Sequence, residues 1–130
     1  MILVDSSVWI DYFNGRETRE TNAFQNLLGQ QEIVVGDLIL TEVLQGFVSD
    51  IHYRRAKQLL REFPTVTMLG PEMAIRSADS YRILRKRGVT VRKTIDVMIG
   101  TYCIVYSIPL LYSDRDFDPM ARYLGLKTLT

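Results

Sequence analysis

Residues 2–7 read Ile-Leu-Val-Asp-Ser-Ser, which is a short apolar run followed by an aspartate and two serines. An unbroken β-type apolar run of this length is typical of a strand buried on both faces of a parallel sheet. Asp5 stands at the carboxyl end of that strand, and Ser6 and Ser7 can cap a following helix. The stretch therefore predicts a strand, a polar sheet edge and a helix in direct succession, which is how an α/β fold begins.

The rest of the chain continues this alternation. Further strands are predicted at residues 33–35, 65–69 and 110–112, with an edge strand at 127–129. Helices are predicted at residues 8–13, 17–28, 38–48, 50–63, 71–87, 95–106 and 119–124, with Asp37, Asp50 and Thr94 as helix caps. We therefore expect an α/β fold: one domain over residues 1–130, with a mainly parallel sheet of about five strands flanked by helices on both faces.

Composition excludes several classes of protein. The chain has 130 residues, of which 47% are hydrophobic and 24% charged, and this is the balance of an ordinary globular domain rather than of a disordered chain. Its single cysteine can form neither an internal disulfide nor a thiolate zinc site. No apolar run is long enough to span a membrane, and the first residues do not resemble a secretory signal. We expect a protein of the reducing cytoplasm, without a membrane partner.

A neutral average hides two charged regions. The formal net charge is +1, yet residues 80–95 contain many cations and no acid, whereas three aspartates fall within residues 111–118. The candidate RNA-binding cations in the first region are Arg85, Lys86, Arg87, Arg92 and Lys93. Cations beside an acidic pocket can hold a phosphate backbone, but a solvated helix end accounts for them equally well.

Four acids fall at the ends of successive predicted elements: Asp5, Glu42, Asp96 and Asp114. Each has a structural alternative, such as helix capping for Asp5, a solvated helix edge for Glu42, or a favourable position near a helix N-terminus for Asp96. Glu42 is the most informative, because it is the only charged residue between Leu38 and Ser49 and an unpaired buried carboxylate costs several kcal/mol. In an α/β sheet, ligands bind beyond the carboxyl ends of the strands, where Asp5 and Asp114 are expected.

Gathered carboxylates repel one another by about 4 kcal/mol at 4 Å and an effective dielectric of 20. A divalent cation removes this repulsion, and an all-oxygen ligand set favours Mg²⁺ or Mn²⁺. The sequence offers little for other kinds of catalysis or nucleotide binding. His52 is the only histidine, Cys103 lies in the most apolar predicted helix, and no nucleotide-binding glycine motif is present. Gly100, inside the same helix, predicts the close approach of another backbone.

Four short motifs, in order along the chain, contain these acids: Val4–Ile10, Leu40–Gly46, Lys93–Asp96 and Ser113–Phe117. They resemble the motifs of the PIN-domain family, and in particular of the VapC toxins of type II toxin–antitoxin systems. The resemblance extends over essentially the whole chain. It implies a PIN-like domain with Mg²⁺- or Mn²⁺-dependent endoribonuclease activity, in which a metal-activated water cleaves an RNA phosphodiester bond.

Carried over residue by residue, the resemblance assigns both catalysis and metal binding to Asp5, Glu42, Asp96 and Asp114. Asp5 and Asp96 would be the most direct metal ligands. Ser7 would support Asp5 or contact phosphate, and Asp116 could share or replace the role of Asp114. The resemblance also implies a homodimer and a VapB-type antitoxin partner, for which the helices at Glu17–Gly29 and Asp50–Phe63 are candidate surfaces.

Two other functions remain open from the residues alone. A receiver-like phosphoacceptor domain also gathers acids around Mg²⁺, but Ser6 stands where its second acid after strand one would be. A nucleic-acid-binding module without catalysis would use the cations of residues 82–93 and would leave Glu42 unexplained. The endoribonuclease toxin is the hypothesis that uses all four acids.

Overall fold

The computed structural model describes residues 1–129, and these alternate between strands and helices as predicted. The strands are β1 (Ile2–Val4), β2 (Ile33–Gly36), β3 (Thr65–Val66) and β4 (Leu110–Leu111). The helices are α1 (Ser6–Phe13), α2 (Arg19–Leu27), α3 (Asp37–Gln45), α4 (Asp50–Leu60), α5 (Pro71–Lys86), α6 (Thr94–Val105) and α7 (Asp118–Leu124), with a 3₁₀ turn η1 (Arg115–Phe117).

The strands form one parallel sheet in the order β3-β2-β1-β4. β1 is paired on both sides, so that Leu3 lies opposite Val34 of β2 and Leu110 of β4. Every residue of β1 and β2 is buried, which confirms that their apolar runs belong to a sheet covered on both faces. Because all these strands are parallel, their carboxyl ends meet at one edge of the sheet.

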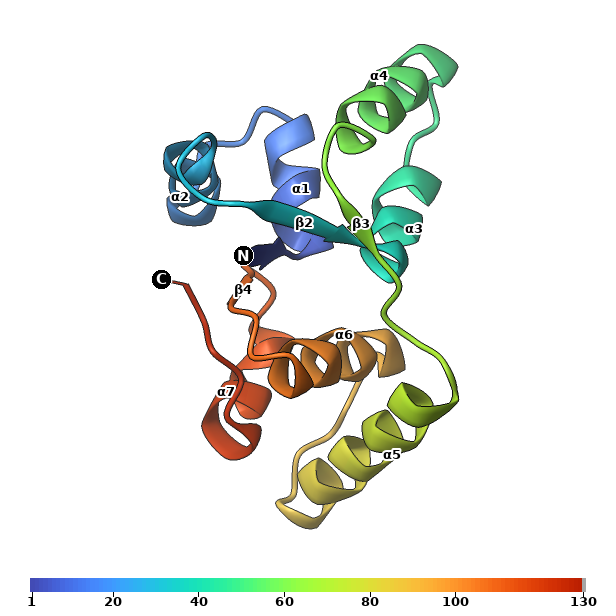
Figure 1. Cartoon of the computed structure of the whole chain (residues 1–130), viewed down its shortest axis with the longest axis vertical. Helices are drawn as coiled ribbons and strands as arrows, with labels where there is room; N and C mark the ends of the chain where they lie inside the picture. The colour runs from blue at the N-terminus through green and yellow to red at the C-terminus, as the bar shows by residue number, and fades with distance from the viewer. Residues whose placement is uncertain (130) are drawn as a thin grey trace.

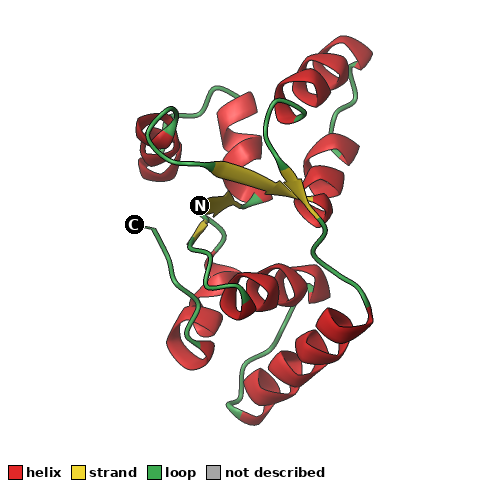
Figure 2. Cartoon of the chain, in the orientation of Figure 1, coloured by secondary structure: helices red, strands yellow, loops and turns green. Residues whose placement is uncertain are grey.

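Helices cover both faces of this sheet, as Figure 1 and the secondary-structure colouring of Figure 2 show. Helices α1 to α4 lie on one side, and α5, α6 and α7 lie on the other. The buried core extends from the strands into both helical layers and includes Trp9 of α1, Ile39 of α3 and Ile99 of α6. None of the helices among residues 1–129 combines the length and the apolar character that crossing a bilayer requires.

The expected fifth strand at 127–129 is the main difference from the predicted fold. Within the described residues it is reduced to a single parallel bridge between Leu110 and Thr128. Its neighbour β4 is only two residues long, so few ladder positions are available to extend the pairing. The sheet therefore has four strands over residues 1–129, with this bridge at its β4 edge.

Helix starts also differ from the predicted caps. Asp37, Asp50 and Thr94 are first residues of their helices, and the capping positions belong to Gly36, Ser49 and Lys93. At α4 the hydroxyl of Ser49 accepts a hydrogen bond from the backbone N–H of His52. Ser49 therefore has the capping role that was predicted for Asp50. Helix α3 ends at Gln45 rather than at residue 48.

The sequence predicted that another backbone would approach Gly100 of α6. In the structure, Gly100 packs against a side chain instead. A Cβ at Gly100 would lie 2.4 Å from both Sδ and Cε of Met120 in α7. Contacts this short force atoms to move, so the absence of a side chain lets α7 pack closely on α6.

We expect Gly100→Ala to lower the free energy of unfolding by about 1 kcal/mol, because the flexible end of Met120 can shift but is itself buried and has little free space to move into. Urea denaturation measures the change. In a Met120→Ala background the same substitution should stabilise α6 instead, because alanine is favoured over glycine in a helix by about 1 kcal/mol. An equal loss in both backgrounds would show that Met120 is not the cause.

Candidate metal centre

Asp5 lies directly after β1 and is the N-cap of α1. Its Oδ2 accepts hydrogen bonds from the backbone N–H of Ser7 at 3.0 Å and from the Ser7 hydroxyl at 2.6 Å. The residue is only 2% exposed, and its other oxygen, Oδ1, is buried without a hydrogen-bond partner. Burial raises the pKa of Asp5 to about 6, against the lowering effect of the Ser7 bonds.

Ser7 joins the ends of two strands. Its Oγ donates to Asp5 at 2.6 Å and accepts from the backbone N–H of Ser113, two residues beyond β4, at 3.2 Å. The hydroxyl therefore fixes the orientation of the Asp5 carboxylate relative to the loop that follows β4. This is the supporting position that the sequence suggested for Ser7.

Glu42 lies on α3 and faces the same edge of the sheet. Its Oε1 accepts a hydrogen bond from the Ser6 hydroxyl at 3.0 Å. The Glu42 charge contributes to the raised pKa values of both Asp5 and Asp96, which places the three carboxylates in one electrostatic neighbourhood. The sequence indicated Ser6 as a helix cap, and no local signal pointed to its bond with Glu42, which is 36 residues away.

Asp96, in the first turn of α6, is 5% exposed. Burial raises the pKa of its carboxyl to about 7, although the Lys93 ammonium opposes the shift. The carboxylates of Asp5, Asp114 and Glu42 raise it further. The Lys93 Nζ stands 3.6 Å from Asp96 Oδ2, beyond hydrogen-bonding distance, and this buried oxygen has no hydrogen-bond partner among the described residues.

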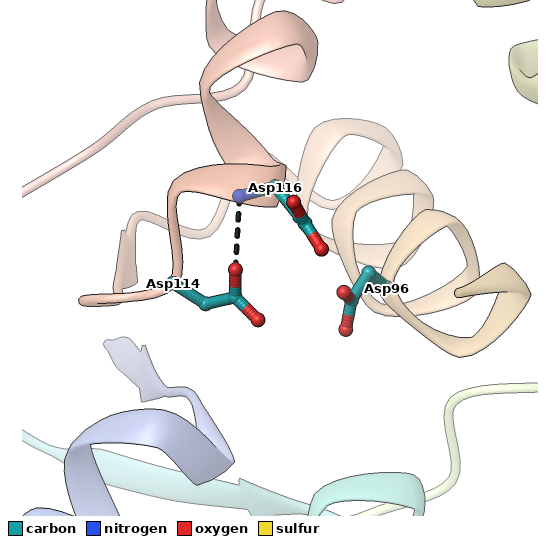
Figure 3. A group of neighbouring side chains, drawn as sticks. All are labelled: Asp96, Asp114 and Asp116. Atoms are coloured by element: carbon teal, nitrogen blue, oxygen red, sulfur yellow. Dashed lines mark hydrogen bonds between the residues drawn. The ribbon is translucent and has the colours of Figure 1, made fainter. Parts of the chain in front are cut away.

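Asp114 and Asp116 approach Asp96 from the segment after β4, as Figure 3 shows. Carboxylate oxygens of the three residues lie within 4.8 Å of one another. Asp114 Oδ1 accepts from the backbone N–H of Asp116 at 2.9 Å, and its Oδ2 accepts from Lys93 Nζ at 3.0 Å. Although partial burial acts to raise the pKa of Asp114, these two bonds and the nearby cations hold it below its ordinary value.

We call these three aspartates, Asp96, Asp114 and Asp116, together with Asp5 and Glu42, the acidic cluster. Asp5 and Glu42 are outside the 4.8 Å group and are linked to it by the effect of their charges on the pKa of Asp96. The acidic cluster fits a hard divalent cation on two observations. The donors are all oxygens, the ligand type that Mg²⁺ and Mn²⁺ prefer. In addition, Asp5 Oδ1 and Asp96 Oδ2 are buried and have no hydrogen-bond partner within residues 1–129, and unpaired carboxylate oxygens are costly unless a cation satisfies them. The acidic cluster could therefore hold a metal ion.

The predicted RNA-binding cations separate into two groups. Arg85 and Lys86 lie in the last turn of α5 and Arg87 at its C-cap, and the guanidinium of Arg87 lies 5.3 Å from the centroid of the Tyr123 ring. Arg92 and Lys93 instead contact the acidic cluster itself, since Arg92 bonds Asp116 at 2.8 Å. The sequence placed all five in one basic patch and did not indicate these ion pairs, which join residues more than twenty positions apart.

Several other polar or reactive residues are structural. Cys103 is buried, and burial raises the pKa of its thiol to about 12, which confirms it as a core residue. Asp37 accepts from the backbone N–H groups of Leu38 and Met68 and so connects the ends of β2 and β3. Tyr112 is buried, and its hydroxyl donates a hydrogen bond to Asp118.

Fold and site together define a class: a parallel α/β domain with carboxylates converging at the carboxyl edge of its sheet. A profile of the PIN domain matches residues 2–123, and the chain belongs to this family. It is 28% identical over 129 residues to a VapC ribonuclease of Mycobacterium bovis, covering 98% of this chain and 96% of the relative. It is also 28% identical over 126 residues to the ribonuclease VapC1 of Methanocaldococcus jannaschii, covering 97% and 85%.

Solved structures show the same fold. VapBC2 from Rickettsia felis, bound to a DNA fragment from its promoter, aligns over 99% of this chain and 98% of that chain, with a TM-score of 0.79 and 13% identity. The FitAcB structure from Neisseria gonorrhoeae aligns over 100% and 97%, with a TM-score of 0.77 and 14% identity. These matches confirm the predicted PIN-like fold and favour neither the receiver-like nor the non-catalytic alternative.

Proposed function

We propose that this chain is a metal-dependent endoribonuclease that acts as the toxin of a toxin–antitoxin pair. The observation that carries the proposal is the acidic cluster, in which two buried carboxylate oxygens have no hydrogen-bond partner in the part of the chain that the structure describes. Such a cluster is costly without a cation, and it lies at the sheet edge where α/β domains bind ligands. The curated relatives are ribonucleases, and this supports an RNA substrate.

Asp5, Glu42, Asp96 and Asp114 are the proposed catalytic and metal-binding residues, and the proposed ion is Mg²⁺ or Mn²⁺. When bound, such an ion lowers the pKa of a coordinated water and neutralises charge on phosphoryl oxygens. Ser7 holds the carboxylate of Asp5 in a fixed orientation through its two bonds. Asp114 and Asp116 both place a carboxylate oxygen within 4.8 Å of one on Asp96, so both are proposed ligands of the same ion.

Arg85, Lys86 and Arg87 are the proposed contacts to the RNA backbone outside the acidic cluster. All three are exposed at the end of α5, and Gly88 to Lys93 lead from there directly to Asp96. Arg92 and Lys93, at the edge of the cluster, are proposed contacts nearer the cleaved bond. Exposed cations beside the proposed metal site would attract the phosphates of RNA without selecting a base sequence.

A VapB-type antitoxin is the proposed protein partner, because several structural neighbours are VapBC complexes. An open groove of about 730 Å³ between α1 and α4 offers a mixed surface for it, with apolar side chains such as Phe13, Phe47 and Leu59 beside the polar His52 and Arg55. Of the two surfaces suggested by the sequence, the helix at residues 50–63 borders this groove and the helix at 17–28 does not. A homodimer and a cytoplasmic location remain part of the proposal.

The decisive test is cleavage of structured RNAs by the purified protein with Mg²⁺ or Mn²⁺ and with EDTA. We expect cleavage with either ion, its loss in EDTA, and its recovery when the ion is restored. Cleavage that persists in EDTA would exclude a metal-dependent mechanism. Binding of RNA without cleavage under all conditions would favour the non-catalytic module, and labelling by acetyl phosphate would favour the receiver-like domain.

A further inference from the structure

Lys93 is a cation that lies against two members of the acidic cluster. Its Nζ donates to Asp114 Oδ2 at 3.0 Å and lies 3.6 Å from Asp96 Oδ2, so one ammonium stands between two proposed metal ligands. Arg92 pairs with the third member of the cluster, Asp116, at 2.8 Å. Two adjacent residues of this chain therefore supply positive charge where a divalent ion is proposed to bind.

The ammonium satisfies these carboxylates only in part. It forms a hydrogen bond with Asp114 but leaves Asp96 Oδ2 without one, and Asp5 Oδ1 is also unpartnered. A lysine ammonium carries a single charge and three donors on a flexible stem, whereas a divalent ion can bind several carboxylate oxygens at once. Lys93 therefore reduces the repulsion within the cluster without removing the demand for a stronger cation.

Lys93 is also placed so that it can move away. Its side chain is 48% exposed, and the residue stands at the N-cap of α6, where it makes no side-chain capping bond. The segment before it, from Gly88 to Arg92, belongs to neither a helix nor a strand. Withdrawal of the ammonium would break its ion pairs with Asp114 and Asp96 but would not remove a helix cap or a buried packing contact.

We propose that Lys93 is a built-in competitor for the divalent ion, occupying the space between Asp96 and Asp114 until ion binding drives it out. This inference rests on the proposed metal site. Lys93 thereby sets the metal affinity, because only molecules in which the ammonium has withdrawn can bind the ion fully. The apparent dissociation constant equals the intrinsic one divided by the fraction of molecules in which the site is open.

Calorimetric titration with Mn²⁺ of the wild-type protein and of Lys93→Gln tests this role without RNA. We expect Lys93→Gln to bind Mn²⁺ roughly 3- to 10-fold more tightly, the change expected when most unliganded molecules have the site blocked. Lys127→Gln is the matched control. It removes the same charge from an exposed lysine. The backbone oxygen of Lys127 accepts from the N–H of Leu110 at the start of β4, whereas the acidic cluster lies beyond the end of that strand.

A second measurement uses the wild-type protein alone and so does not depend on the folding of a variant. The chain has four lysines, Lys57, Lys86, Lys93 and Lys127, so their ε-carbon NMR signals can be resolved after selective labelling. Titration with diamagnetic Mg²⁺ should shift the Lys93 signal in step with ion uptake and leave the Lys127 signal in place. A Lys93 signal that stays unchanged at saturating Mg²⁺ would overturn the proposal.

The outcomes separate this inference from the function on which it depends. If the wild-type protein takes up neither Mn²⁺ nor Mg²⁺, the proposed metal site itself is wrong. If it takes up Mn²⁺ with the same affinity as Lys93→Gln, only the role of Lys93 is wrong. Equal tightening in Lys93→Gln and Lys127→Gln would point to the overall charge of the protein and would also contradict a specific competitor.

Discussion

Asp96→Asn is expected to reduce RNA cleavage by on the order of 1000-fold, because a metal ion contributes several kcal/mol of transition-state stabilisation and each 1.4 kcal/mol is tenfold. Asparagine keeps the shape of the side chain and removes the charge that would hold the ion. The fold should survive, since Asp96 is buried and its pKa of about 7 shows that the metal-free protein disfavours its ionised form. Initial cleavage rates in saturating Mg²⁺, with circular dichroism as the folding check, measure both effects.

Asp50→Asn is the matched control for this substitution. Asp50 also lies in the first turn of a helix, α4, but it is exposed and outside the acidic cluster. Both variants lose the same favourable interaction with a helix N-terminus, so only the position relative to the cluster differs. Asp5→Asn should behave as Asp96→Asn does, with its amide oxygen still able to accept from Ser7. Full activity of either cluster variant in Mg²⁺ would contradict its assignment as a metal ligand.

The second large effect is a loss of stability in the metal-free protein as the pH rises from about 4 to about 8. Folding raises the pKa of Asp5 from 3.8 to about 6 and that of Asp96 to about 7, so the native state binds more protons than the unfolded state across this range. Stability must then fall with rising pH. At about 1.4 kcal/mol per pKa unit, Asp5 alone accounts for about 3 kcal/mol.

Other groups with shifted pKa values act outside this window. The pKa of Asp114 is lowered, so its contribution is present above the ordinary carboxyl range and is lost only in stronger acid. The pKa values of Arg92 and Lys93 are raised from values that already exceed 10. The decline between pH 4 and 8 therefore reports mainly on Asp5 and Asp96.

Urea denaturation in EDTA at pH 5 and pH 8 measures this decline. Mn²⁺ at 100 times its dissociation constant should restore about 2.7 kcal/mol at pH 8, because the ion binds only the folded protein. The double variant Asp5→Asn/Asp96→Asn should show neither the decline nor the restoration. A wild-type protein whose stability is flat or rising over this range would mean that the two carboxyls are not forced to ionise in a buried site.

Local patterns were sufficient for most of the fold. The apolar runs at residues 2–4 and 33–35 became buried central strands, since a run with no polar position can only be satisfied by burial on both faces. Pro71 starts α5 as predicted, because proline suits the first turn of a helix. The predicted fifth strand is reduced to a single bridge, because strand pairing depends on the partner strand as well as on the local sequence. Its partner, β4, has only two residues.

The sequence predicted which acids belong to the candidate site but did not predict the contacts that they make. The sequence indicated which acids stand at the ends of elements, since that depends only on position along the chain. It did not indicate that Ser6 bonds Glu42 or that Gly100 makes room for Met120. These contacts join residues from 20 to 36 positions apart, and no local propensity reports on them.

The sequence by itself determined a parallel α/β domain and the acids expected at the edge of its sheet, because hydrophobic periodicity and residue type are local properties of the chain. The PIN type followed from the resemblance of four short motifs. Only the tertiary structure decided that Asp116 comes together with Asp96 and Asp114 within 4.8 Å, and that Lys93 stands between two of these acids. The physical reason is that the energy of a charge depends on its distance from other charges and on its burial, and folding sets both.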